Sequence, residues 1–314
     1  MFDAGWHRQM FYDFAIAEIA SGGPDPHLRL TEVLARKTED PAWFVGCYTA
    51  PYVVSTAEVI AAHWSRERVL NSPVMFSEWI SKNWYRLPIR KERRVNGTGP
   101  VKLAEILFKY AQWLSEQSLI WTTDFDEAYA RISAVPHHGR YFGMKLYETL
   151  RRAVGGLPEF PDIRPKQGSL ARRGLALMFP EHNPKDDSSE GLEEANRLSD
   201  KLRETITGMD WFTVEVLLCN YRQAFAGRQY PGRAHDSELG HAAIVQDSWS
   251  GLQLEMLSMR PKLFPKEHLG EIQGWSDRRL ELGKVMTDHN YVWSDMLFDY
   301  KRTKDLSQPV GRKI

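Results

Sequence analysis

Apolar residues recur along much of the chain at intervals of three and four, the period of an amphipathic α-helix. In the stretch 101–117, for example, the leucine, isoleucine and tyrosine residues fall on one helical face. Alternating runs of β-branched residues, which mark strands, are few. The pattern therefore predicts an all-α protein. We expect helices at 7–20, 28–36, 43–52, 55–69, 76–85, 101–117, 124–132, 139–154, 192–207, 211–225, 238–245 and 275–285.

Local signals indicate where some of these helices begin. Ser55 and Glu58 have the spacing of a capping box, in which each side chain would bond to a backbone N–H of the first turn. Asp124 or Asp126 is the expected N-cap of the helix that follows it.

Two stretches without helical periodicity divide the chain. Residues 155–168 are rich in Pro and Gly, and residues 180–191 are strongly polar, so both are expected to be long connections. We predict a helical domain over 1–180 with a hairpin-type turn that grips DNA. A linker over 181–191 and a helical region over 192–314 would complete the same globule.

The composition limits the classes of protein to consider. A chain of 314 residues that is 42% hydrophobic can bury a large core. The 41 basic residues balance the 41 acidic ones, so any site for a polyanion must be a local patch. Two cysteines cannot form a disulfide framework, which fits a reducing compartment. No signal peptide or membrane-spanning stretch is visible, so we expect a cytoplasmic protein, in the host cell if it is phage-encoded.

A tight turn between two expected helices is the first candidate site. The sequence from Pro136 to Tyr141 reads Pro-His-His-Gly-Arg-Tyr. A helix, a Pro/Gly turn and a second helix resemble the helix-hairpin-helix of DNA glycosylases, in which backbone N–H groups and a helix N-terminus hold a phosphate. Arg140 and Lys145 would add positive charge there. The alternative is an ordinary turn with Gly139 in a left-handed conformation.

A basic stretch over 79–102 is the second candidate. Its cations are interleaved with Trp79, Trp84 and Tyr85, and Glu92 is its only acid. Such a pattern suits a groove that follows a nucleic-acid backbone and stacks bases, whereas the alternative is a solvated charged loop. The Gly-rich loop 96–100 could also hold a pyrophosphate through its amides. The cations are Lys82, Arg86, Arg90, Lys91, Arg93, Arg94 and Lys102.

The third candidate lies within 213–239. Glu215, Cys219 and Arg222 are spaced by four and three, which places them close to one helix face. A Gly turn with Arg233 and Asp236 follows. Glu215 or Asp236 could act as a general base, and Arg222 or Arg233 as an anion clamp. The alternative is an internal Glu–Arg pair with Asp236 as an N-cap, and Cys219 is expected to be buried.

Other classes of site have little support in the sequence. The two cysteines are far apart and His137-His138 lacks further ligands, so we expect no metal site. We also expect no cofactor, although Mg²⁺ carried on a phosphate substrate would leave almost no sequence trace. The phosphate-binding loop of ATPases, the dinucleotide fingerprint and the nucleophile elbow are all missing.

Taken together, these segments resemble a family of bacteriophage enzymes that hypermodify thymine in DNA. The family includes amino acid:DNA transferases, glutamyl/putrescinyl-thymine pyrophosphorylases and the helical domain of hydroxymethyluracil DNA kinases. The resemblance spans roughly 10–245 and implies a helical DNA-glycosylase-like fold. Base excision fits poorly, because no Asp follows the hairpin at the distance at which glycosylases place their catalytic Asp. A kinase would need a nucleotide-binding domain, and the sequence shows no sign of one. The resemblance rests on 40–44 through 55–58, on 136–141, and on 215–219 with 230–236.

The resemblance implies a substitution on double-stranded DNA that carries an activated thymine. A free amino acid such as glycine would attack the 5-methylene of phosphorylated or pyrophosphorylated hydroxymethyluracil. Aromatic rings would line the pocket of the flipped base. Arginines would stabilise the negative charge that develops on the leaving group. Glu215 or Asp236, then His138, would take the amine proton, with Arg222 at the departing anion. Residues expected to contact substrate or DNA are Trp43, Phe44, Tyr48, Trp84, Arg90, Lys91, Arg93, Arg94, Gly139, Arg140, Lys145 and Arg233.

Two other classes of function use the same features. A non-enzymatic helical DNA-binding or accessory protein would also need the basic stretch and the hairpin. A helical array for protein interaction is favoured if the cations of 79–102 are dispersed over the surface.

Overall fold

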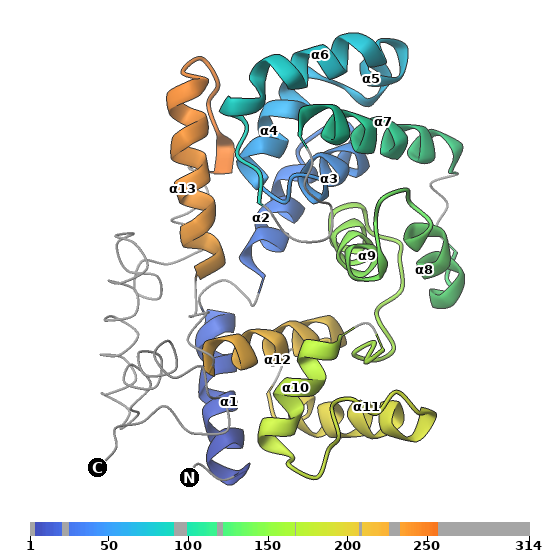
Figure 1. Ribbon diagram of the computed structural model, residues 1–314, viewed down its shortest axis with the longest axis vertical. Coiled ribbons are helices and arrows are strands. Elements are labelled where there is room, and N and C mark those ends of the chain that lie inside the picture. Colours follow the sequence, from blue (N-terminus) through green and yellow to red (C-terminus); the bar gives the residue numbers. More distant parts are fainter. Residues whose placement is uncertain are drawn as a thin grey trace. The chain divides into compact units, whose positions relative to one another are not determined.

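The computed structural model describes residues 4–20, 25–90, 99–117, 122–166, 168–206, 209–225 and 233–256, and every regular element within them is a helix (Figure 1). The all-α prediction is thereby confirmed. The expected helix at 275–285 lies outside the described residues. Contacts divide the chain into two compact units.

The first unit combines Met1–Pro26 with Phe160–Asp236. Its helices are α1 (Ala4–Ala20), α10 (Ser169–Met178), α11 (Ser189–Arg203) and α12 (Trp211–Phe225). Helix α10 packs along α12, and both contact α1 and α11. Phe11, Phe14, Leu175, Leu217 and Tyr221 form the centre of its apolar core.

The second unit combines His27–Glu159 with Ser237–Leu263, of which residues up to 256 are described. Helix α3 is its centre and contacts α4, α7 and α9, while α6 packs on α7 and α8 on α9. Its elements are α2 (Pro26–Ala35), α3 (Pro41–Thr49), α4 (Val54–His63), α5 (Arg66–Asn71), α6 (Pro73–Asn83), the 3-10 helix η1 (Trp84–Arg86), α7 (Pro100–Glu116), α8 (Phe125–Ser133), α9 (Arg140–Val154) and most of α13 (Arg233–Ser248).

Helix α3 can lie at the centre because its sequence is apolar all round. Every residue after Pro41 is buried, as expected of a helix enclosed by other helices. Its start is fixed by Asp40, whose Oδ1 accepts from the N–H of Trp43 at 3.0 Å. Gly46 allows α7 to approach closely, because a Cβ there would lie 2.0 Å from Cε1 of Tyr110.

The capping-box prediction at Ser55 is wrong. Helix α4 begins at Val54, and no side chain caps it. Ser55 instead donates from its N–H and its hydroxyl to Oε1 of Glu238, at 2.9 and 3.0 Å. The expected single helix over 55–69 is also two helices, because α4 ends at His63 and Ser65 caps α5 by accepting from the N–H of Arg68.

Helix α10 has no counterpart among the expected helices, since the sequence around it is dominated by Pro, Gly and polar residues. The polar segment after it is held by the buried Arg172, which donates to the carbonyl of Asp186 at 2.7 Å and to Oδ1 of Asp187 at 2.6 Å. Helix α11 then begins at Ser189, capped by the hydroxyl of Ser188. The domain limits expected from the sequence, including the linker at 181–191, stay a prediction.

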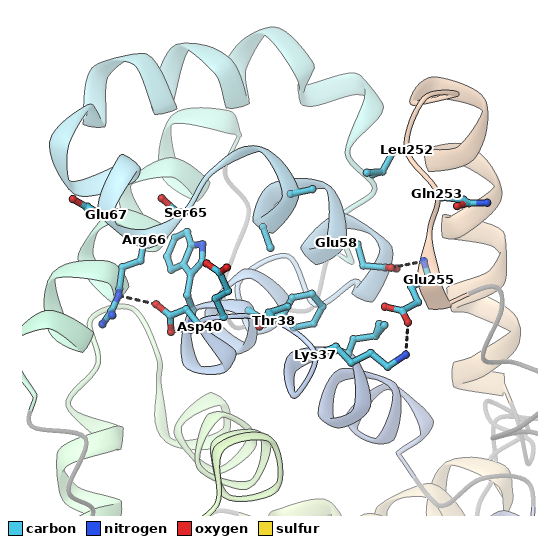
Figure 2. Close-up of a pocket in the computed structure, with 16 residues that line it drawn as sticks. Lys37, Thr38, Asp40, Glu58, Ser65, Arg66, Glu67, Leu252, Gln253 and Glu255 are labelled. Atoms are coloured by element: carbon cyan, nitrogen blue, oxygen red, sulfur yellow. Dashed lines mark hydrogen bonds and ion pairs between the residues drawn. The ribbon is translucent and has the colours of Figure 1, made fainter.

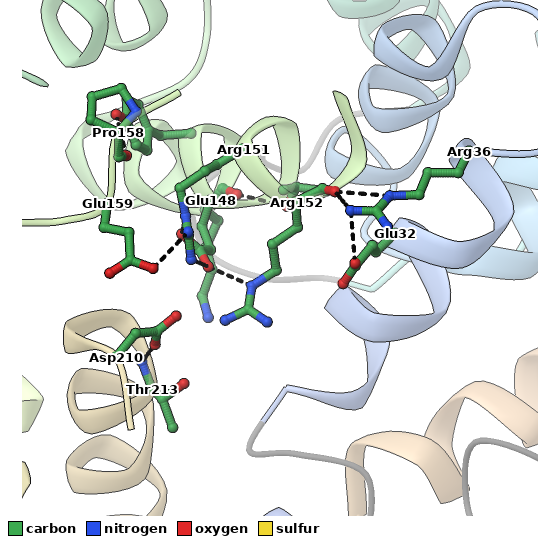
Figure 3. Close-up of polar contacts among 12 residues, drawn as sticks. Glu32, Arg36, Glu148, Arg151, Arg152, Pro158, Glu159, Asp210 and Thr213 are labelled. Atoms are coloured by element: carbon green, nitrogen blue, oxygen red, sulfur yellow. Dashed lines mark hydrogen bonds and ion pairs between the residues drawn. The ribbon is translucent and has the colours of Figure 1, made fainter. Parts of the chain in front are cut away.

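The end of α9 is built around a fully buried carboxylate (Figure 3). Glu148 pairs with Arg151 at 2.8 Å and with Arg152 at 2.5 Å. Arg36 donates from Nε and Nη2 to the carbonyl of Arg152, which satisfies a free acceptor at the end of the helix. Two glycines with positive φ, Gly155 and Gly156, then turn the chain away.

Candidate functional site

A pocket of about 640 Å³ opens in the second unit, between the turn after α2, the starts of α3 and α5, one face of α4 and residues 252–255 (Figure 2). Trp43 and Phe44, two of the aromatic residues expected to line a base pocket, are among its lining residues. Both side chains are largely buried, so they form the floor of the pocket rather than exposed stacking surfaces. Nε1 of Trp43 donates to the carbonyl of Trp64 at 2.8 Å, which fixes the indole.

Glu58 on α4 presents an unusual carboxylate to this pocket. Its Oε1 accepts from the backbone N–H of Glu255 at 2.7 Å and from that of Met256 at 3.3 Å. Its Oε2 is buried and has no partner among the described residues. Burial raises the pKa of Glu58 to about 8, and the charges of Glu238 and Glu255 add to the rise, although the two backbone hydrogen bonds oppose it.

Ion pairs lie at two ends of the pocket (Figure 2). Nε of Arg66 lies 2.9 Å from Oδ2 of Asp40, and Lys37 pairs with Glu255. The lining residues nevertheless carry an excess of acid over base, five against two. The acids are Glu39, Asp40, Glu58, Glu67 and Glu255, and the bases are Lys37 and Arg66.

The other two expected aromatic residues lie elsewhere in the second unit. Tyr48 is buried on α3 and stacks on His27 and Tyr52, and Trp84 is half-buried in η1. Neither is among the residues that line the pocket. The structure therefore brings Trp43 together with Phe44, but not with Tyr48 or Trp84, at one cavity.

A buried polar chain connects Arg90 to Glu238. Oε2 of Glu238 lies 3.2 Å from Nδ1 of His27 and 4.0 Å from Nδ1 of His241. Burial alone would raise the pKa of Glu238, but the contacts with the two histidines and the Ser55 amide outweigh it and hold the pKa well below its usual range. On its other side, Nε2 of His27 accepts from Nη1 of Arg90 at 3.3 Å.

Arg90, one of the cations of the basic stretch 79–102, is thus fixed in place. Its backbone N–H donates to the carbonyl of Pro51 at 3.1 Å, and its guanidinium lies 5.0 Å from the ring centroid of Tyr52. Lys91, Arg93 and Arg94 lie outside the described residues.

The turn expected to form a hairpin lies between α8 and α9, and Asp124 is confirmed as the N-cap of α8. The left-handed residue of the turn is His137, with φ of 69°, whereas Gly139 has φ of −65°. The alternative of a left-handed Gly139 is therefore wrong. Lys145 is only 4% exposed, so it lies inside the unit rather than beside the turn at the surface. That this turn is of the helix-hairpin-helix type and that it grips DNA both stay predictions.

His138, an expected proton acceptor, is buried beneath this turn. Its Nδ1 lies 3.1 Å from the carbonyl of Pro136, which it can reach as a donor, while Nε2 has no partner among the described residues. Burial lowers the pKa of His138 to about 4, with His137 adding to the effect and the backbone hydrogen bond opposing it. The ring is therefore neutral at neutral pH and is a weak base.

The surface beside the turn carries a small basic cluster. Lys102 and Lys109 on α7 pair with Glu105 at 2.8 and 2.7 Å. These hydrogen bonds lower the pKa of Glu105 to about 2. Nε2 of His137 lies 3.4 Å from both ammonium groups. The left-handed turn thereby places His137 beside the two cations of α7.

In the first unit, Glu215 and Cys219 do share one face of α12, as their spacing predicted. Sγ of Cys219 donates to Oε1 of Glu215 at 3.1 Å, and the carboxyl group is buried. Gly168 lies against it, because a Cβ there would be 3.1 Å from the same oxygen. Cys219 is partly rather than fully buried, and Arg222 is half-buried on the same helix.

Three expected site residues have a described backbone but side chains outside the described part. Arg140 is the first residue of α9, and Arg233 and Asp236 lie in the first turn of α13. Because α13 begins at Arg233, the alternative of Asp236 as its N-cap is wrong.

Neither a metal-binding cluster nor a membrane-spanning helix is found among the described residues. No group of three or more His, Cys, Asp or Glu side chains there could hold a metal ion, and no helix there is both long and apolar enough to cross a bilayer.

Residues 30–230 match the family model of the amino acid:DNA transferases. The match covers 201 of the 314 residues, from 30 through 230 inclusive. The chain belongs to the amino acid:DNA transferase family. No curated protein and no solved structure matches it significantly. Membership of the amino acid:DNA transferases implies a transferase whose substrates are DNA and an amino acid.

The amino acid:DNA transferase match includes most of the pocket lining, the turn between α8 and α9 and Glu215 on α12. Glu238 and Glu255, which complete the surroundings of Glu58, follow the matched span. Sequence reasoning missed Glu58 as a site residue. The only available signal was a carboxylate in a capping-box position, and that signal pointed to a different role.

Proposed function

We propose that this amino acid:DNA transferase joins an amino acid, such as glycine, through its amine to the 5-methylene carbon of pyrophosphorylated 5-hydroxymethyluracil in phage DNA. The nitrogen lone pair forms the new C–N bond, and the C–O bond to the leaving group breaks with its electron pair on pyrophosphate. The observation that carries the proposal is the family match over 30–230.

The pocket of the second unit is proposed as the reaction site. It combines an aromatic floor at Trp43 and Phe44 with the buried carboxylate oxygen of Glu58, and ligand sites commonly pair an apolar cavity with a few polar groups. The base must leave the DNA stack to enter it, at a cost of a few kcal/mol. This arrangement supports a site that takes up a flipped base and an amine together.

Positive charge is needed for two separate tasks. Binding of the duplex is assigned to Arg90, with Lys91, and to the hairpin with the adjacent Lys102 and Lys109, because phosphate contacts supply most of the affinity for DNA. Stabilisation of the departing pyrophosphate is assigned to the arginines expected from the sequence, since preorganised donors must meet its developing charge. Those in the second unit are Arg90, Arg93, Arg94 and Arg140.

The decisive experiment uses DNA that contains pyrophosphorylated 5-hydroxymethyluracil. Incubation with the protein and pooled amino acids should release pyrophosphate and give a nucleoside whose mass identifies the amino acid that was added. Plain DNA and DNA with unphosphorylated 5-hydroxymethyluracil are the controls. Salt-sensitive DNA binding without any new nucleoside would instead indicate an accessory DNA-binding protein.

Further arms of the experiment test the finer assignments. A phosphorylated substrate in place of the pyrophosphorylated one identifies the leaving group, and a chelator tests whether Mg²⁺ is carried in on it. Glu215→Gln and Asp236→Asn test two of the expected bases, and a loss of tenfold or less in both would argue against them. We also propose that the protein acts in the cytoplasm, which the two free cysteines support.

A further inference from the structure

Charges at the pocket of the second unit indicate what kind of group it accepts. Two of its five acids are neutralised, Asp40 by Arg66 and Glu255 by Lys37. Glu39 and Glu67 are exposed at its rim. A cavity lined by more acid than base favours a ligand with a positively charged group.

Glu58 is the acid that can receive this group inside the pocket. One of its oxygens is used by two backbone donors, which fix the carboxylate from the side of residues 255–256. The other oxygen is buried and has no donor among the described residues. A buried acceptor without a donor is unfavourable, so a ligand that brings an N–H group to Oε2 gains a strong, charge-assisted hydrogen bond.

We propose that this pocket binds the ammonium group of the amine donor at Oε2 of Glu58, and that the Glu58 carboxylate takes the proton which the amine must lose before attack. The proposal rests on the proposed transfer function and adds a donor site and a catalytic base to it.

The proton step follows from the position of this carboxylate. The ammonium gives one proton to Oε2, and the freed lone pair of nitrogen then forms the bond to the 5-methylene carbon as pyrophosphate departs. The product is a secondary ammonium, which loses its second proton to solvent. The raised pKa of Glu58 makes the first transfer less unfavourable, because it brings the carboxyl closer to the range in which amines titrate.

The charged groups around Glu58 come from three directions. Lys37 follows α2, Glu255 lies in the segment after α13, and Glu238 lies on α13 itself. Arg66 and Asp40 form their own pair toward α5. Lys37 is the one cation of this set on the Glu58 side, and it is paired with Glu255. A second ammonium on the donor is therefore favoured over a second carboxylate. This predicts that lysine binds more tightly than glycine, and that glycine binds more tightly than glutamate.

Binding to the full-length protein without DNA tests the donor site by itself. Calorimetric titration with lysine, glycine and glutamate should give the order above. At about pH 8.5, where most of the Glu58 carboxyl is ionised, Glu58→Gln should weaken lysine binding at least tenfold, because an amide keeps the acceptor for the 255–256 amides but loses the charge. Glu78→Gln, an exposed acid on α6 outside the pocket, is the matched control and should bind as the wild type does. Unchanged lysine binding by Glu58→Gln would overturn the donor site.

The pH profile of transfer tests the catalytic base. With Glu58 as acceptor, kcat/KM should pass through an optimum, because the reaction needs the carboxylate ionised and the donor bound as an ammonium. In Glu58→Gln the rate should fall by roughly 10²–10⁴-fold at neutral pH and should then rise with pH until the free amine is fully formed. A variant that keeps the wild-type optimum and rate would overturn the assignment.

The two proposals fail in different ways. If the wild-type protein leaves the activated DNA unchanged with every amino acid, the proposed function is wrong, and the binding titration still decides whether the pocket is an amine site. If transfer occurs but neither binding nor the pH profile depends on Glu58, only the assignment of this pocket is wrong.

Discussion

The carboxylate of Glu238 lies 3.2 Å from Nδ1 of His27, and this buried contact connects α13 to the start of α2. The same carboxylate accepts two hydrogen bonds from Ser55 at the start of α4. Three helices of the second unit therefore meet at one fully buried side chain. A buried ion is stable only when its lone pairs are satisfied, and here neighbours from two other helices surround it.

Replacement of Glu238 by Ala should destabilise the protein by about 3–5 kcal/mol, because it leaves His27 and the Ser55 donors buried without their acceptor. Urea unfolding at pH 7 measures the loss, with Glu78→Ala as the exposed control. The folded-state pKa of Glu238 is depressed, so its contribution is present above its unfolded pKa of about 4.5 and is lost as the pH falls below it. The difference in the free energy of unfolding between the wild type and the variant should therefore become smaller at acidic pH.

Glu58→Gln should have the opposite dependence on pH. The pKa of Glu58 is raised from 4.5 to about 8 in the folded protein, so its stabilising contribution is complete below pH 4.5 and is lost as the pH rises through 8. The shift from 4.5 to about 8, at about 1.4 kcal/mol per pKa unit, corresponds to a loss of roughly 5 kcal/mol in the wild type, whereas glutamine does not titrate. Between pH 5 and pH 9 the free energy of unfolding should fall more in the wild type than in the variant, so the variant should be relatively more stable at pH 9 than at pH 5. Parallel curves would contradict the raised pKa.

Gly46→Ala should disrupt the packing of α3 on α7. The new Cβ would lie 2.0 Å from a ring carbon of Tyr110, whose hydroxyl donates to the carbonyl of Ala42 at 2.9 Å. The ring cannot move without breaking that hydrogen bond in a packed core, so we expect a loss of about 3 kcal/mol, at the upper end for overpacking. Gly139→Ala, where a Cβ meets nothing within 4 Å, should cost much less. Thermal unfolding of both variants gives the comparison.

The basic cluster of Lys102 and Lys109 beside the turn between α8 and α9 should contribute to DNA binding through charge alone. Lys102→Ala with Lys109→Ala should weaken binding of plain duplex DNA and reduce the slope of log affinity against log salt by up to about 2, or roughly 0.9 for each phosphate that is no longer neutralised. Glu105→Gln should strengthen binding, because it removes the acid that pairs with both cations. Identical salt slopes in all three proteins would exclude this cluster from the DNA interface.

Much of the fold could be predicted because it is encoded locally. The periodicity of α7, the extent of α12 and the cap at Asp124 are properties of short windows of sequence, and all three are confirmed. Helix α10 was missed although it carries an apolar face, since its flanks have the composition of connections. Its packing on α12 depends on Gly174, where a Cβ would lie 2.5 Å from the carbonyl of Leu218. A close approach of this kind has no signature in the sequence of either helix alone.

The candidate site was only partly predictable, and the reason is sequence distance. Trp43 and Phe44 stood out because they are aromatic, and they do line the pocket. Glu58 and Ser55 have the spacing of local partners three residues apart. In the folded protein Glu58 instead accepts from the N–H of Glu255, 197 residues further along the chain. Ser55 donates to Glu238, which is 183 residues further along. The spacing of two neighbouring residues cannot predict a hydrogen-bond partner that is distant in sequence and comes close only in the folded protein.

The donors that hold Glu58 belong to the main chain at Glu255 and Met256, not to their side chains. Related chains could therefore exchange the residue types at these two positions and keep the carboxylate where it is. Insertions or deletions between Trp249 and Glu255 should not be tolerated, because the indole of Trp249 donates to the carbonyl of Arg86. A change in length there would move the two amides away from Glu58. Near this pocket, spacing along the chain should be more strictly preserved than residue identity.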